Sequence, residues 1–164
     1  MGDLMSPLPS WAPNVHPLVV HFPIATLAAA VLADILSAST VTRSSLNPSA
    51  TGLYIVGATA ALIANFSGYY ASSTEMVPLG ALDTLHAHED WAFQATWLFV
   101  FFASIRLLIS YVTPPTRIVR YGALVIALYG LWAIAMTTMH GHRLVFEYGV
   151  GVASDTKQGR GTSE

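Results

Sequence analysis

The sequence predicts an all-α integral membrane protein, a bundle of four transmembrane helices. Of its 164 residues 54% are hydrophobic and 10% are charged, with a mean hydropathy of +0.55, whereas soluble domains carry about 25% charged residues. Four segments reach the length of about 20 mostly apolar residues that a spanning helix needs. All six histidines lie near the ends of these segments. The low share of charged residues predicts that the chain lies in a lipid bilayer. The histidines are candidates for binding a metal or cofactor there.

The predicted spans form a single transmembrane domain and cover roughly residues 18–39, 52–72, 89–112 and 118–140. Polar residues and proline, which break helices, separate the first two spans (Ser44, Ser45, Asn47 and Pro48) and the last two (Pro114 and Pro115). The first span lacks preceding Lys or Arg and so does not resemble a signal peptide. Residues 141–153 are predicted to be an interfacial segment covering the histidines, and 154–164 a polar tail.

The distribution of basic residues predicts the orientation. Arg43 follows the first span, Arg117 and Arg120 join the last two, and the loop 73–88 has no Lys or Arg. Cytoplasmic loops are enriched in Lys and Arg. Both termini and the loop 73–88 are therefore expected on the non-cytoplasmic side of a bacterial inner membrane, which the chain crosses several times.

The histidines come in three pairs, His16 with His21, His86 with His88, and His140 with His142. In a chain of four spans, the start of span one, the end of span two, the start of span three and the end of span four lie on the same side. All three pairs are therefore expected in one layer, outside the cytoplasm. Ionisable residues at a membrane boundary usually have a function, so this layer is the candidate site for a metal or cofactor.

The composition restricts the chemistry of that site. The chain has no Cys, which excludes thiolate-held iron–sulfur clusters, covalently attached haem and cysteine zinc sites. The basic residues are few and scattered, so no nucleic-acid partner is expected. Residues i and i+2 of a helix point about 200° apart. Each histidine pair would thus serve two separate sites, either two haems with two histidines each or two metal sites with three.

Haem b, one or two per chain, fits the surroundings better, because small residues of the first two spans leave room for a flat macrocycle. The expected ligands are His16, His21, His88 and His140, with Arg143 near the propionates. His21 and His140 stand out because they lie at membrane depth, where an unpaired imidazole is costly. Aromatic walls are expected from Tyr69, Tyr70, Trp91, Phe93, Trp97, Trp132 and Phe146. A zinc or copper site built from the six histidines is the alternative, with Glu89, Asp90, Met136 and Met139 as further ligands.

Three polar side chains inside the spans are expected to bond between helices. Asp34 is expected to reach the interface or to hydrogen-bond a neighbouring helix, with a role in a proton path as the alternative. Asn65 and Gln94 are candidates for hydrogen bonds between helices.

Two motifs at the ends of the chain carry a family resemblance. The opening Asn14-x-His16-Pro17-x-x-x-His21-Phe22-Pro23-Ile24-Ala25 and the end Leu144-Val145-x-x-x-Gly149-Val150-Gly151-Val152 resemble a bacterial family of small four-helix membrane proteins catalogued as a domain of unknown function. The chain has Phe146-Glu147-Tyr148 where relatives often carry another histidine. The resemblance implies the fold and the membrane location. Some relatives look fused to Rieske-type domains, which implies electron transfer.

The sequence therefore predicts a membrane cytochrome of b type that passes electrons between quinone and a redox partner outside the cytoplasm. It would act as an electron-transfer subunit of a larger membrane complex rather than as a stand-alone enzyme. A metal-binding protein without haem and a purely structural membrane subunit are the alternatives.

Overall fold

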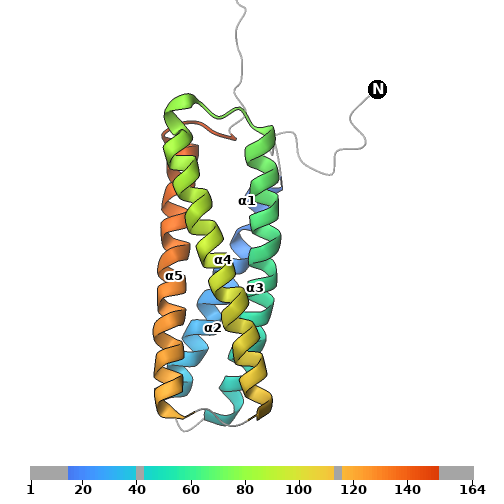
Figure 1. Ribbon diagram of the computed structural model, residues 1–164, viewed down its shortest axis with the longest axis vertical. Helices are drawn as coiled ribbons and strands as arrows, with labels where there is room; N and C mark the ends of the chain where they lie inside the picture. The colour runs from blue at the N-terminus through green and yellow to red at the C-terminus, as the bar shows by residue number, and fades with distance from the viewer. Residues whose placement is uncertain (1–14, 40–42, 113–115, 152–164) are drawn as a thin grey trace, which may run out of the picture.

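The computed structural model describes residues 15–39, 43–112 and 116–151, and all regular structure within them is helical. The elements are α1 (His16–Val19), α2 (His21–Ser39), α3 (Arg43–Thr74), a 3-10 turn η1 (Leu79–Ala81), α4 (Leu82–Val112) and α5 (Arg117–Phe146). Figure 1 shows the long helices side by side, with α1 and α2 following one another along the same side of the bundle. The predicted all-α fold of four helices is confirmed.

Four helical segments are long and apolar enough to cross a membrane: His16–Ser37, Pro48–Thr74, Leu79–Ser110 and Arg117–Phe146. Large apolar side chains such as Phe66 on α3 and Leu108 on α4 point away from the bundle. Outward apolar groups cost nothing in lipid. The four predicted spans are confirmed, although their helices extend further than expected at several ends.

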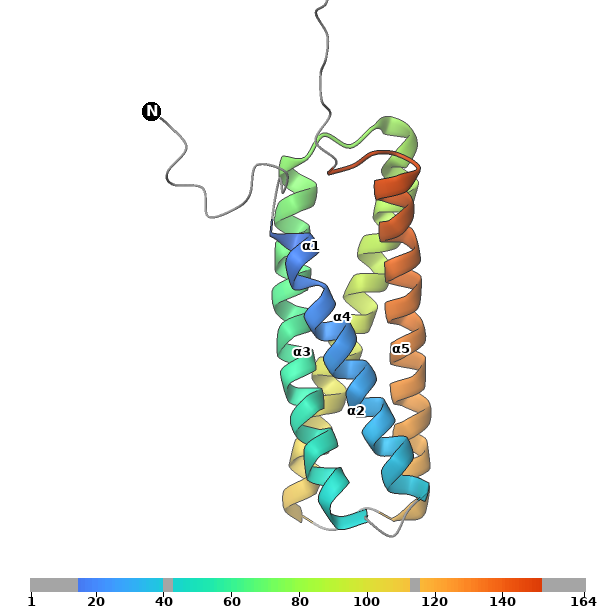
Figure 2. The same cartoon turned by 180° about the vertical axis from the view of Figure 1, so that it is seen from behind.

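The bundle consists of two helical hairpins. In the first α2 packs mainly on α3, and in the second α4 packs on α5. Figures 1 and 2 show α4 running obliquely, beside α5 at one end of the bundle and nearer α3 at the other. The start of α1, the end of α3, the start of α4 and the end of α5 lie at the same end. The chain trace therefore brings the histidine-bearing segments together, as predicted.

The break between the first two spans differs from the expectation. Ser44, Ser45, Asn47 and Pro48 lie inside α3, which begins at Arg43. Pro48 is the sixth residue of α3, beyond the first four helical N–H groups, so it interrupts the helical hydrogen bonding close to the start of the helix. The turn predicted at Pro114 and Pro115 and the tail 154–164 lie outside the described residues.

A second difference concerns the segment predicted to be interfacial. Residues 141–146 continue α5, and the helix stops only before Gly149 and Gly151, both of which have positive φ angles. Glycine adopts this conformation readily, so it ends helices. The Val150 N–H donates to the Leu144 carbonyl, and Leu144 is buried. The end of α5 thus turns back toward the bundle.

The core lies between the hairpins and includes the fully buried Leu27, Tyr54 and Phe99. Two glycines let the helices approach closely. A Cβ on Gly57 would lie 2.6 Å from the Leu27 side chain, and one on Gly130 would lie 2.5 Å from Phe99. In lipid, close packing through small residues is a main source of helix association.

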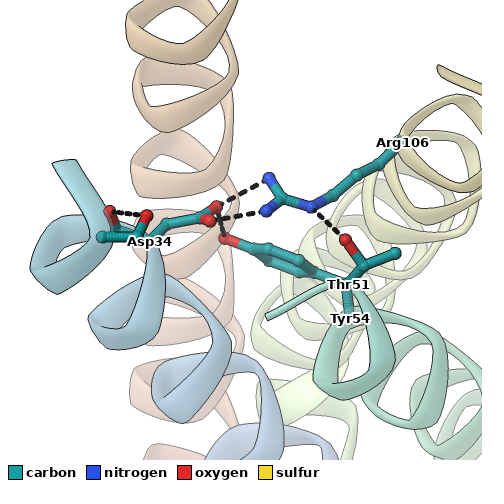
Figure 3. Close-up of polar contacts among 5 residues, drawn as sticks. Asp34, Thr51, Tyr54 and Arg106 are labelled. Carbon is teal, nitrogen blue, oxygen red and sulfur yellow. Dashed lines mark hydrogen bonds and ion pairs between the residues drawn. The ribbon is translucent and has the colours of Figure 1, made fainter. Parts of the chain in front are cut away.

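A buried ion pair joins three helices at the end of the bundle opposite the histidines (Figure 3). Arg106 of α4 donates two hydrogen bonds to Asp34 of α2, of 2.8 and 2.6 Å. Its Nε donates to Thr51 of α3 at 2.9 Å, and the Tyr54 hydroxyl donates to Asp34 at 3.1 Å. The guanidinium also lies 5.1 Å from the centre of the Tyr54 ring. We call these four residues the Asp34–Arg106 cluster.

The cluster confirms that Asp34 bonds to neighbouring helices. The expectation for the other two polar residues is met only in part. Asn65 of α3 donates to the Thr96 hydroxyl of α4 over 3.5 Å, a long hydrogen bond. Gln94 is exposed on the outside of the bundle, so it does not pack between these helices.

The orientation in the membrane can be tested with reporter fusions. A reporter at Glu164 or within residues 73–85 is expected to report the non-cytoplasmic side, and one near Ser45 the cytoplasmic side. The physical reason is the location of Arg43, Arg117 and Arg120 at the opposite end from the histidines. The reverse pattern would place the histidines on the cytoplasmic side.

Candidate functional site

The histidines divide into an inner and an outer set. The inner histidines, His16, His88 and His140, are partly buried, and the outer histidines, His21, His86 and His142, are exposed. Each pair supplies one member to each set. For His86 with His88 and for His140 with His142, the reason is the helical rotation of about 200° between residues i and i+2. The members of each pair therefore lie at different locations, as the helix geometry predicted.

His16 lies against the first hairpin. It begins α1, with Pro17 in the first turn, where proline fits a helix start. Its ring packs on α3, and a Cβ on Gly68 would lie 2.9 Å from Cε1 of the imidazole. The His16 Nδ1 and the Ser67 hydroxyl are 2.9 Å apart. Ser67 and Gly68 of α3 thus hold the His16 ring, and we call the residues that hold a histidine ring its seat.

His88 lies against the second hairpin. Its Nδ1 is 2.8 Å from the Thr137 carbonyl oxygen of α5. A Cβ on Gly141 would lie 3.0 Å from Cε1 of the ring. Side chains of a helix lean toward the preceding turn, so a larger residue at position 141 would obstruct the approach to Thr137. Gly141 therefore opens the seat of His88.

His16 and His88 face each other across the two hairpins. Their ring centroids are 6.5 Å apart, and the ring planes are nearly perpendicular at 88°. Two imidazoles that share one metal ion, each nitrogen about 2 Å from it, have centroids roughly 6 Å apart. The observed separation is close to that of a shared ion.

His140 stands beside this pair. Its Nδ1 lies 2.7 Å from the Met136 carbonyl of its own helix. It is close enough to His88 for an electrostatic interaction between the two rings, and Glu89 also acts on His88. The site therefore consists of the two opposed imidazoles of His16 and His88, and His140 acts on His88 electrostatically.

The hydrogen bonds define which ring nitrogen carries the proton in the neutral histidines. A carbonyl oxygen can only accept, so Nδ1 donates in His88 and in His140. The lone pair of these neutral rings is then on Nε2. Histidines that bind metals usually donate their other ring N–H to a carbonyl or carboxylate. Both rings thus have the protonation that a metal ligand requires.

Within the described ranges, no three His, Asp or Glu side chains are arranged to hold one metal ion. Zinc and copper sites in proteins usually take three or four side-chain ligands. A b-type haem needs only two, above and below its plane. The arrangement of His16 and His88 fits this smaller requirement.

Several residues predicted for the site lie elsewhere. His21 is exposed, and its Nδ1 bonds to the Pro17 carbonyl one turn earlier. Arg143 forms an exposed ion pair with Glu147 on its own helix, at 3.0 Å. The chain is helical at both positions, so each side chain follows the helical rotation, which here points it out of the bundle.

The predicted aromatic walls also point outward for the most part. Tyr69, Tyr70, Phe93 and Phe146 are among the exposed large side chains, as are Trp97 and Trp132. Trp91 is partly buried and packs edge-on against Trp132, with ring centroids 4.9 Å apart. These rings suit the lipid interface, where aromatic residues are enriched, more than the lining of an internal slot.

Sequence reasoning did not identify the seats of the two opposed rings. Ser67 and Gly68 of α3, and Thr137 and Gly141 of α5, are ordinary residues of helices. Gly141 stands next to His140 in the sequence. The structure shows that it admits His88 of another helix instead. The sequence shows small residues that could lie against a histidine. Only the helix packing shows which small residue lies against which histidine.

The comparisons with known proteins support the family resemblance. Residues 12–154 match the family described as "Predicted membrane protein (DUF2231)". The chain belongs to this family. No curated protein and no solved structure matches it. The family description agrees with the four membrane spans and leaves the chemistry of the histidines open.

Proposed function

We propose that this DUF2231 protein binds one b-type haem between its two hairpins, with His16 and His88 as the axial ligands. The observation that carries the proposal is the opposed pair itself, with its centroid separation of 6.5 Å. The two rings come from different hairpins, so the bound group would join them.

The surroundings of the pair support a ligand role. Each ring rests on a helix at a glycine, Gly68 for His16 and Gly141 for His88. The Nδ1 of each ring is hydrogen-bonded, to Ser67 and to the Thr137 carbonyl. Such bonds hold an imidazole in one orientation and increase its basicity as a ligand. Both imidazoles are thereby held in place, with their ring centroids 6.5 Å apart.

A haem with two histidine ligands has no open position, and such a haem supplies one-electron transfer. We propose that electrons pass between quinone in the bilayer and a redox partner on the non-cytoplasmic side of a bacterial inner membrane. The basic residues at the opposite end of the bundle support this orientation. The protein would serve as a subunit or partner in electron transfer.

A metal-binding protein without haem is the second candidate. The observation in its favour is His140, which lies beside His88 and has its lone pair on Nε2. In this candidate His16, His88 and His140 would supply three imidazoles to one copper or zinc ion, with a fourth position for water.

The absorption spectrum of the purified full chain tests the proposal. We expect a reducible b-type spectrum from haem that acid acetone extracts, because no Cys is present to attach it covalently. Metal analysis of the same preparation is the companion measurement. A haem-free protein with stoichiometric copper or zinc would favour the second candidate. A protein with neither, even after expression with added haem precursor, would contradict both and favour a structural role.

A further inference from the structure

We infer that Ser67 is the positioning residue that fixes His16 with its proton on Nδ1 and its lone pair on Nε2. This inference rests on the proposed function for its purpose, since it says how the chain prepares one of the two ligands. It concerns a hydroxyl that is not itself a ligand.

The direction of the Ser67 hydroxyl is determined by its own helix. The Ser67 Oγ lies 2.8 Å from the Ala64 carbonyl oxygen, one turn earlier. Because a carbonyl only accepts, the single hydroxyl proton of Ser67 is directed to Ala64. The remaining lone pairs of Oγ can then only accept a proton from a neighbour.

The neighbour is the His16 ring. Its Nδ1 lies 2.9 Å from the Ser67 Oγ, so Nδ1 is the donor while the Ser67 hydroxyl donates to Ala64. A neutral imidazole with its proton on Nδ1 has its lone pair on Nε2. A hydrogen bond made within one helix thus decides the tautomer of a histidine 51 positions earlier in the chain.

The same rule holds for the opposed ring, with a different acceptor. His88 donates from Nδ1 to the Thr137 carbonyl, which no substitution of a side chain removes. His16 is the ring whose orientation depends on a side chain. Both rings therefore carry the proton on Nδ1, His16 through a side-chain acceptor and His88 through a backbone acceptor. Only the acceptor of His16 can be removed by a mutation.

The test compares Ser67→Ala, Ser67→Thr and Ser73→Ala in the full chain. Ser73 is a matched control, since its hydroxyl bonds in the same way to the Tyr70 carbonyl on an exposed part of α3. Imidazole ¹⁵N chemical shifts are recorded for haem-free protein in micelles, and a His16→Gln variant assigns the His16 signals.

In the wild type we expect His16 with its proton on Nδ1. Ser67→Ala should lower the ratio of the Nδ1–H to the Nε2–H form about two- to tenfold, the equivalent of one ordinary hydrogen bond. Ser67→Thr should restore it, because threonine retains the hydroxyl, and Ser73→Ala should leave it unchanged. In haem titrations Ser67→Ala should weaken binding by about 10–100-fold, as is typical when a partner of a ligating histidine is removed.

Two results would overturn the inference. One is a wild-type His16 with its proton on Nε2. The other is an unchanged ratio in Ser67→Ala, which would mean that the Ala64 carbonyl, which also interacts with the ring, holds His16 by itself. Failure of the proposed function looks different, because the wild-type protein would bind no haem while the ¹⁵N shifts still reported Nδ1–H.

Discussion

Replacing Arg106 by alanine is expected to destabilise the bundle by about 3–5 kcal/mol, the usual cost of removing one partner from a buried ion pair. The Asp34 and Arg106 side chains are only 10% and 15% exposed. Without the guanidinium, the Asp34 carboxylate would be left among α2, α3 and α4 with the Tyr54 hydroxyl. Thermal unfolding in detergent, followed by circular dichroism, and the yield of monodisperse protein measure the effect.

Arg143→Ala is the matched control for this prediction. Arg143 also forms a salt bridge, with Glu147, but both side chains are about half exposed. Exposed pairs contribute about 0–1 kcal/mol. The double variant Asp34→Asn with Arg106→Gln should recover much of the lost stability, because it removes both charges and keeps polar partners. If Arg106→Ala were no more harmful than Arg143→Ala, the Asp34–Arg106 cluster would not be what holds the three helices together.

The second large effect is expected at the opposed histidines. His16→Ala and His88→Ala should each abolish haem binding, since either change leaves the iron without one of its two protein ligands. Haem content is measured per purified chain from the spectrum of the reduced protein. Membrane depth suggested His21 and His140 as haem ligands. The geometry favours His16 and His88 instead, because these two rings face each other.

The outer histidines are the controls. His86→Ala and His142→Ala remove exposed rings two positions from an inner histidine, and both variants should retain haem. His21→Ala should retain it as well, because the His21 ring is exposed and bonded to the Pro17 carbonyl of α1. Loss of haem in His21→Ala, with full haem content in His16→Ala, would refute the assignment of the axial pair. His140→Ala separates the candidates, since a three-histidine metal site would lose its ion and a haem held by two ligands would not.

The fold was predictable because the bilayer imposes a simple requirement. A segment in lipid must satisfy its backbone hydrogen bonds internally, so a long apolar run becomes a helix. Four such runs, joined by short connections, lead to an antiparallel bundle with the histidines at one end. Helix ends were less predictable. Pro48 lies within α3, and α5 continues to Phe146, because a helix can continue past a proline near its start and ends where the glycines at 149 and 151 take positive φ angles.

The contacts of the Asp34–Arg106 cluster could not be predicted from its residues considered singly. Two opposite charges within apolar spans were visible in the sequence, at comparable distances from the same membrane face. Their pairing depends on the rotation of α2 and α4 about their own axes, which places the two side chains 2.6 Å apart. The burial of Tyr54 beside them depends on the same rotation.

By itself the sequence determined the number of spans, the family and the layer in which all six histidines lie, because these follow from apolar length, motif and chain direction. Only the tertiary structure decided which histidines face one another. Membrane depth made His21 the favoured ligand, but depth says nothing about the direction in which a side chain points. Helix packing turned His21 outward and seated His16 on Gly68 and His88 on Gly141. Those seats depend on contacts between residues far apart in the chain, so a local pattern of residues does not show which residues form them.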